Sequence, residues 1–69
     1  MRDNMKTKIS PKSLLKHGFV KVRLPNGQII YLRNGVAIMW AHYRWFYIVL
    51  INGAAYLQQM TVAYVEDIP

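Results

Sequence analysis

The two histidines, His17 and His42, are the side chains of this sequence best suited to catalysis. Imidazoles exchange protons near neutral pH, so two of them with a lysine could cleave RNA by acid–base chemistry. However, His17 is expected at a helix end and His42 in a turn, with nothing to orient either ring. Ser10 and Ser13 are better explained as helix caps than as nucleophiles. We therefore expect that this protein is not an enzyme.

Carboxylates and thiolates, the other common reactive groups, are scarce. The three acidic residues, Asp3, Glu66 and Asp67, lie at the chain ends, and there is no cysteine. Paired-carboxylate catalysis and hard-metal sites therefore have no carboxylate pair to use inside the domain, and two histidines without a nearby Cys, Asp or Glu make a poor zinc site. The four glycines are all expected at turns or helix ends, so no glycine-rich phosphate loop is present. The sequence predicts neither a cofactor nor a metal.

Positive charge dominates the chain. Nine lysines and arginines against three acids give a formal charge of +6 over 69 residues. Such a domain attracts polyanions, which include nucleic acid, a ribonucleoprotein, an acidic protein surface and anionic lipid. A basic protein without any such partner is the alternative.

The chain is expected to hold one domain, residues 9–69, after a flexible basic arm, residues 1–8. The arm has no periodic apolar pattern and no apolar segment of a secretory signal. The longest apolar run, residues 36–51, has sixteen residues and contains His42 and Arg44. A membrane-spanning helix needs about 20 residues and rarely carries such side chains, so we expect two strands and no membrane partner.

A short helix over residues 11–17 is expected to begin the domain. Ser10 can cap its amino end, and Pro11 suits the first helical position. Leu14 and Leu15 form its apolar stripe, and Gly18 is typical of the position after a helix.

Three turns are expected to divide residues 20–51 into four antiparallel strands. Pro25-Asn26-Gly27 is typical of a three-residue loop, which pairs Val22 with Ile30. Asn34-Gly35 predicts a type I′ turn. The third turn is placed at His42-Tyr43, and a shift by one residue there would exchange the two faces of the following strand.

The end of the chain is expected to form a helix over residues 54–65, with Asn52-Gly53 as its amino-terminal cap. β-branched residues at 61, 62 and 65 leave a terminal strand over residues 61–66 as the alternative. The predicted fold is therefore α+β, with a short N-terminal helix, a four-stranded antiparallel β-meander and a C-terminal helix packed on one sheet face.

The predicted register gives the sheet two different faces. One is uniformly apolar and is expected to form the core with both helices: Val20, Val22, Leu24, Ile30, Leu32, Ala37, Met39, Phe46, Ile48 and Leu50. The other is expected to be open and carries aromatic and basic side chains. Its candidate residues for binding a partner or nucleic acid are Lys21, Arg23, Tyr31, Arg33, Trp40, Arg44, Trp45 and Tyr47.

Aromatic rings on an open sheet can stack unpaired bases, and neighbouring arginines and lysines can neutralise phosphates. The same residue types are common at protein interfaces. Packing of a homodimer or stabilisation of the sheet alone would also explain them.

The segment Ile9 to Phe19, the strand residues Trp45-Phe46-Tyr47 and the late Tyr56-Leu57-Gln58-Gln59-Met60 resemble small proteins of Bacteroidetes and their phages. The likeness spans about residues 9–65, although this chain is basic where the others are acidic. The resemblance implies a possible anti-CRISPR protein in the bacterial host cytoplasm. Its implied partner is a host nucleoprotein, namely a type VI RNA-targeting CRISPR effector or its guide RNA.

We therefore expect a small non-catalytic binding protein that inhibits such an effector. The alternative is a stand-alone module for single-stranded RNA or DNA.

Overall fold

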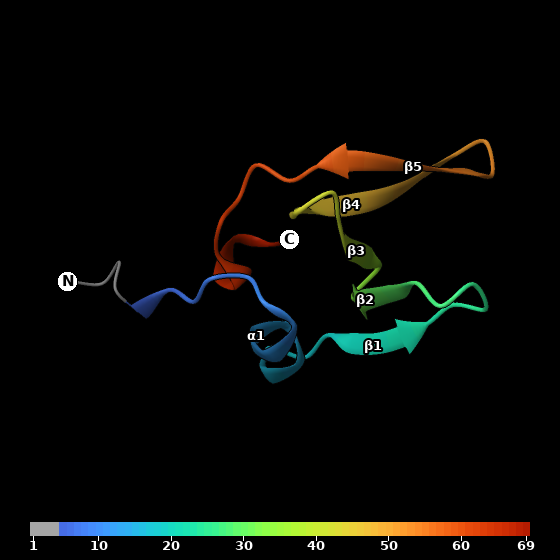
Figure 1. The fold of residues 1–69 in the computed structure, drawn as a ribbon. Helices are drawn as coiled ribbons and strands as arrows, with labels where there is room; N and C mark the ends of the chain where they lie inside the picture. Colours follow the sequence, from blue (N-terminus) through green and yellow to red (C-terminus); the bar gives the residue numbers. More distant parts are fainter. Residues whose placement is uncertain (1–4) are drawn as a thin grey trace.

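A computed structural model describes residues 5–69 as a short helix followed by a five-stranded antiparallel sheet (Figure 1). The elements are α1 (Pro11–Lys16), β1 (Val20–Arg23), β2 (Ile29–Arg33), β3 (Val36–Ala41), β4 (Arg44–Ile51), β5 (Ala54–Gln59) and the 3₁₀ turn η2 (Val65–Asp67). The strands follow one another across the sheet in chain order. The α+β class and the antiparallel meander are confirmed, whereas the number of strands and the C-terminal helix are not.

Helix α1 forms as predicted, because its amino end is capped twice. The Ser13 amide donates to Ser10 Oγ at 3.1 Å, and the Ser10 amide donates to Ser13 Oγ at 2.9 Å. Such reciprocal capping satisfies two amides that a helix start leaves unpaired. Gly18 follows the helix with a φ of +92°, which a glycine adopts without strain. Within residues 5–69, no helix is long and apolar enough to cross a membrane.

The first three turns also form as predicted. The Leu24 amide donates to the Gln28 carbonyl at 2.7 Å across the first loop, and Val22 lies opposite Ile30. The second turn, Asn34-Gly35, has positive φ at both residues and pairs β2 with β3. The third turn lies at His42-Tyr43 and sets Trp40 opposite Trp45, so the predicted register is confirmed through β4.

The predicted C-terminal helix is wrong, because Asn52-Gly53 is a hairpin turn rather than a helix cap. Asn52 has a φ of +52° and Gly53 of +82°, as a type I′ turn requires, whereas a cap residue is extended. The chain therefore turns back as β5, with Leu57 opposite Ile48. The alternative strand over residues 61–66 is also wrong, since Tyr64 makes only an isolated bridge before η2.

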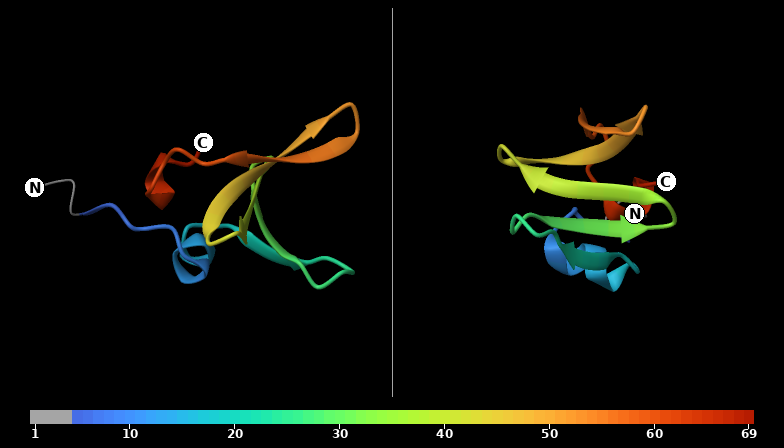
Figure 2. Two further views of the ribbon diagram at one scale, coloured as in Figure 1. Left: turned by 45° about the horizontal axis from the view of Figure 1, so that its top comes forward. Right: turned by 90° about the vertical axis from the view of Figure 1, so that its right-hand side faces the viewer.

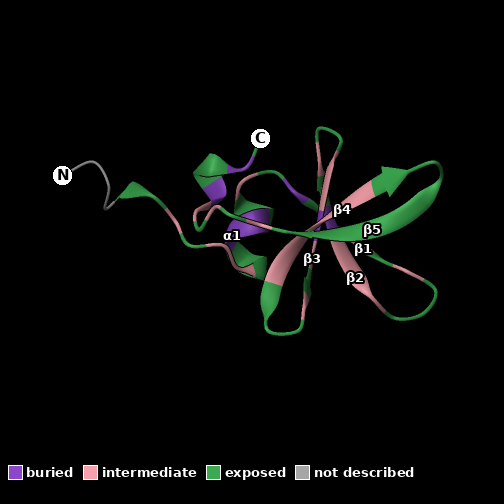
Figure 3. Cartoon of the chain, turned by 90° about the horizontal axis from the view of Figure 1, so that it is seen from above, coloured by how far each residue is buried: buried purple, intermediate pink, exposed green. Residues whose placement is uncertain are grey.

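The core lies on one side of the sheet, where α1 and the C-terminal segment pack against β2 and β3. Its buried residues come from all of these elements: Leu14, Phe19, Tyr31, Ile38, Val65 and Ile68. Figure 3 shows the buried parts of α1 and of the C-terminal segment together beside the sheet. We call this side of the sheet the covered face.

The opposite side of the sheet, which we call the open face, is the one that the sequence predicted to be the core. It carries the ten predicted residues named above, and the β4–β5 register adds Ala55 and Leu57. Leu50 is 72% exposed there. Viewed from that side, the sheet stands in front, with α1 and the C-terminus behind it (Figure 2, right). The predicted assignment of the two faces is therefore wrong.

The residue just before β1 explains this inversion. Phe19 is buried with Leu14, and strand alternation places Phe19 on the same side as Lys21 and Tyr31. Helix α1 is joined to β1 only by His17 to Phe19, so the helix must lie on the side to which Phe19 points. The uniform apolar pattern of the other face did not decide which face the helix covers.

The predicted basic arm is held at its described end rather than free. The Val65 amide donates to the Thr7 carbonyl at 2.9 Å, and the Thr7 amide donates to Glu66 at 2.8 Å. Lys6 lies 3.2 Å from Asp67. The prediction for residues 1–4, including Arg2, falls outside the described residues. Residues 6–8 therefore belong to the folded domain and close it against η2.

Candidate binding site

The central aromatic residues of the predicted site lie beneath α1 and the C-terminal segment. Tyr31 is only 5% exposed and belongs to the core, while Trp45 and Tyr47 are partly buried against it. The prediction that this face is open is wrong, so Tyr31 offers no free ring face to a partner. Its aromatic contacts are internal, with the Tyr31 and Trp45 ring centroids 5.9 Å apart in an edge-to-face arrangement.

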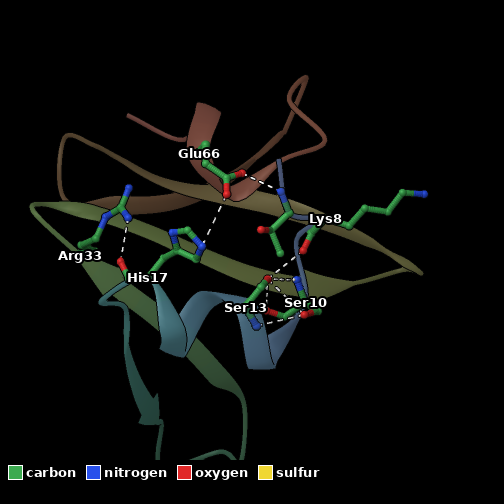
Figure 4. A network of polar contacts seen from close by, with 7 residues as sticks. Lys8, Ser10, Ser13, His17, Arg33 and Glu66 are labelled. Atoms are coloured by element: carbon green, nitrogen blue, oxygen red, sulfur yellow. Dashed lines mark hydrogen bonds and ion pairs between the residues drawn. The ribbon is translucent and has the colours of Figure 1, made fainter. Parts of the chain in front are cut away.

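Arg33, also predicted to bind a partner, instead joins the two ends of the fold. Its Nη1 donates to the His17 carbonyl at 2.9 Å, and its Nη2 donates to the Ile68 carbonyl at 3.2 Å. The guanidinium also lies 4.3 Å from the centroid of the Phe19 ring. Figure 4 shows the bond to the end of α1. Arg33 therefore supplies hydrogen-bond donors to a carbonyl at the end of α1 and to one near the C-terminus.

The other four predicted residues remain accessible, although they do not form one surface. Lys21 and Arg23 are exposed on β1, at one edge of the sheet. Trp40, near the end of β3, is 49% exposed, and Arg44 is exposed at the start of β4. Trp40 and Arg44 flank the His42-Tyr43 turn, so these two belong to the same end of the sheet.

A pocket of about 560 Å³, which we call the aromatic pocket, opens beside Trp40. Its walls come from the segment before α1 and from the sheet: Ile9, Ser10, Pro11, Gly27, Gln28, Ile29, Tyr31, Trp40 and Trp45. The Trp40 and Trp45 rings meet edge to face at 5.2 Å, which holds both indoles in place. Its volume is within the range of small-ligand sites.

A second pocket, of about 390 Å³, adjoins the first and is more polar. We call it the basic pocket, because Lys8 and Arg44 line it together with Tyr43. Ile9 and Trp45 line both pockets, so the two share a wall. An aromatic recess thus lies next to a recess with two cations, both at the end of the sheet near the His42-Tyr43 turn.

The turn between β3 and β4 is strained in a way that the other type I′ turns are not. His42 has a φ of +52° and Tyr43 of +63°, whereas the other two turns use Asn followed by Gly. A left-handed conformation costs roughly 1 to 2 kcal/mol for an ordinary L-residue. Such strain often marks a functional site, and Tyr43, which is largely exposed, lines the basic pocket.

The carboxylates within residues 5–69, Glu66 and Asp67, are both engaged away from the pockets. The Thr7 amide holds the pKa of Glu66 below its usual value, and the nearby His17 acts in the same direction. Glu66 Oε2 lies 3.6 Å from His17 Nε2 (Figure 4), which is an ion pair only when His17 is protonated and is longer than a hydrogen bond. No acidic residue of the described chain lines either pocket, which leaves Lys8 and Arg44 there without an opposing carboxylate.

No group of three or more His, Cys, Asp or Glu residues that could hold a metal ion occurs within residues 5–69.

Lys8 and Tyr43 are site residues that the sequence prediction missed. The sequence places Lys8 in the basic arm and Tyr43 only in a turn. A type I′ turn without Asn or Gly was the signal available for Tyr43. For Lys8, the position is fixed by the isolated bridge to Tyr64, which joins residues far apart in sequence, and by the Ser13 hydroxyl, which donates to the Lys8 carbonyl at 2.8 Å.

The fold and the site together define a small antiparallel-sheet protein with an aromatic pocket and a basic pocket side by side. Comparisons of the chain with protein-family models, with curated proteins and with solved structures found no significant match.

Proposed function

We propose that this protein binds single-stranded nucleic acid without catalysis. A base occupies the aromatic pocket against Trp40, and the adjoining phosphate lies between Lys8 and Arg44. The observation that carries the proposal is the shared wall: Trp45 lines both pockets, so a stacking site and two cations are adjacent. Stacking of a base on an aromatic side chain contributes about 1 to 3 kcal/mol, and every base offers a ring face.

The charge of the chain supports the same ligand. A formal charge of +6 attracts a polyanion from a distance, and no carboxylate of residues 5–69 opposes it at the pockets. The strand could be free or exposed on a nucleoprotein, since the recognised chemistry is the same. The narrower expectation of an anti-CRISPR inhibitor of an RNA-targeting effector stays a prediction, as does its location in the bacterial cytoplasm.

Titration of a fluorescent single-stranded oligouridine or oligothymidine tests the stacking half of the proposal. We expect Trp40→Ala to weaken binding by roughly 5- to 150-fold, the loss of one stacked base. Tyr56→Ala removes another half-exposed aromatic residue that lines neither pocket, and it should leave affinity unchanged. Equal losses in both variants would contradict a specific pocket.

Salt dependence tests the phosphate half. Each neutralised phosphate of a single strand contributes about 0.7 to the slope of log affinity against log salt. Arg44→Gln should reduce that slope by about 0.7. Lys16→Gln makes the same charge change on α1, away from both pockets, and should reduce it less. Equal slopes for these two variants would mean that the net charge of the chain attracts the strand without a specific phosphate site.

Two further binding experiments distinguish a free strand from RNA on a nucleoprotein. A purified RNA-targeting effector with its guide should be bound and inhibited if the ligand is RNA on a nucleoprotein, and Trp40→Ala should weaken both effects. A bare oligonucleotide should suffice if the ligand is free. Failure of the wild-type protein to bind either would overturn the proposal. Cleavage of labelled RNA that is lost in both His17→Ala and His42→Ala would instead show an enzyme.

A further inference from the structure

The open face is the largest feature of the molecule that the proposed nucleic-acid site does not use. It presents side chains from all five strands, and no segment of residues 5–69 lies over it in Figure 2. Strand β5 is exposed along its whole length, as Figure 3 also shows. Beyond the residues of β4 that pair with β3, β4 and β5 continue as a two-stranded ribbon, and an isolated ribbon is marginally stable in water without a packed face.

The cations of β1 and β2 point away from the open face. Lys21, Arg23 and Arg33 all lie on the covered face, because they alternate with Val20, Val22 and Leu32. Within residues 5–69, Arg44 at one corner is the charged side chain on the open side. Residues 45–65, which include β5 and nearly all of β4, contain no charged residue at all. A chain with a formal charge of +6 thus has one broad neutral surface.

We propose that a second copy of this chain docks on the open face, so that two sheets pack face to face. Two chains of the same charge repel each other, and the open face is where they can approach without bringing cations together. An apolar face without charge is also self-complementary, as a twofold interface requires. Stacked sheets with interdigitating apolar side chains are a common arrangement, about 10 Å apart.

The size of the open face fits this occupant. With about 120 Å² for a fully exposed aliphatic side chain, Val20, Leu32, Leu50 and Leu57 together present about 260 Å², and the partly buried residues raise the total to roughly 300 to 500 Å². Patches of that size on a small protein are commonly functional. Two such faces bury roughly 600 to 1,000 Å², at or below the lower limit for a specific protein interface, so the dimer should be weak and dissociate on dilution.

A lipid surface fits less well than a second copy. Proteins that lie on membranes combine an apolar face with cations that reach the anionic headgroups. Here Lys21 and Arg23 project from the opposite side of the sheet, away from any lipid that the open face would touch.

Sedimentation velocity over a range of concentrations tests the proposal with a matched pair of variants on β5. Leu57 and Tyr56 are neighbours with 45% and 53% exposure, but Leu57 points to the open face and Tyr56 to the other side. We expect the wild-type chain to form a reversible dimer, Leu57→Lys to be monomeric, and Tyr56→Lys to remain dimeric. Both residues are exposed, so both variants should fold, which circular dichroism would verify.

A second pair, Leu50→Lys and Ile51→Lys, repeats the test at the tip of β4, again with only the first residue on the open face. Equal loss of dimer in both members of each pair would indicate pairing of β5 edges and would overturn the proposal. A wild-type protein that is monomeric at every concentration would also overturn it, as would binding to lipid vesicles that Leu57→Lys abolishes. Trp40→Ala should leave the dimer intact, which separates this inference from the nucleic-acid site.

Discussion

The face of the sheet that forms the core and the face that is exposed are the opposite of what their compositions suggest. The covered face contains Tyr31, Lys21 and Arg33 together with Ile38, yet it forms the core. The open face is almost purely apolar, yet it has no cover within residues 5–69. The difference teaches that the core forms where the terminal segments dock, and that their docking is set by a few anchors such as Phe19.

The faces also divide the charge of the molecule. The covered side bears the strand cations and the aromatic pocket, whereas the open side is neutral apart from Arg44. A polyanion and a second copy of a basic chain require opposite electrostatic surroundings. Alternation along β1 and β2 keeps their cations off the open face, while Lys8 and Arg44, the cations of the proposed nucleic-acid site, lie at one end of the sheet.

The largest expected effect is the loss of stability when a buried isoleucine of the covered face is shortened, compared with one on the open face. Ile38 is fully buried on the covered face, whereas Ile48 on the open face is only partly buried. Ile38→Ala should lower the free energy of unfolding by about 2 to 5 kcal/mol, since it removes buried atoms and leaves a cavity. Ile48→Ala should cost clearly less in dilute solution, where chains do not associate. Chemical denaturation would measure both, and equal losses would contradict the assignment of the core.

A smaller effect is expected from the arginine that holds the covered face closed. Arg33→Leu leaves the His17 and Ile68 carbonyls without their donor, which should cost about 1 to 3 kcal/mol. Arg23→Leu makes the same change at an exposed position of the same face and should lie within about 0.5 kcal/mol of wild type. Thermal and chemical denaturation of the two variants would show whether Arg33 is structural. If the Arg33→Leu and Arg23→Leu variants had similar free energies of unfolding, Arg33 would not be structural and would again be a candidate binding residue.

Much of the fold could be predicted from turn chemistry. Pro25-Asn26-Gly27 and Asn34-Gly35 specify their turns locally, so the register of β1 to β3 followed from sequence. The same rule applied to Asn52-Gly53 would have given β5. The apolar spacing of residues 54–65, which also suits a helix, led to the wrong prediction there. A short apolar segment leaves helix and strand ambiguous, and here the turn decided.

The candidate site was predictable only in part. Trp40 and Arg44 follow from the third turn, which the sequence placed correctly. The burial of Tyr31 and Trp45 depends on which side α1 lies, and the role of Lys8 depends on a contact with Tyr64. Such long-range contacts leave no periodic trace in the sequence, so alternation defined both faces but not which one would be covered.

A further prediction concerns the strained turn at the edge of the covered face. Tyr43→Gly relieves a left-handed tyrosine and should stabilise the chain by about 1 kcal/mol. The same variant should weaken binding of single-stranded oligonucleotides, because it removes a side chain of the basic pocket. Gly53→Ala, at the unstrained turn, should instead destabilise the fold without affecting that binding. If Tyr43→Gly bound single-stranded oligonucleotides as tightly as the wild-type chain, Tyr43 would be a turn residue only.

The smallest expected effect tests how the terminal segments close the covered face. The Thr7 amide lowers the pKa of Glu66 in the folded chain, so the ionised carboxylate stabilises closure. This contribution is complete above the pKa of the unfolded chain and is lost as the pH falls through the lower pKa of the folded chain. Protection of the Thr7 amide from hydrogen exchange should therefore drop in acid.

Glu66→Gln should remove that acid-dependent drop, because its amide does not titrate and can still accept from Thr7. Asp67→Asn leaves the bond between Thr7 and Glu66 in place and should keep the drop. If protection of Thr7 were lost equally in all three proteins, the acid would be acting on the sheet and not on the closure. If protection of the Thr7 amide persisted in acid only in Glu66→Gln, the Glu66 carboxylate would contribute to holding the terminal segments over the covered face. Acid would then loosen those segments and raise the solvent exposure of the covered face.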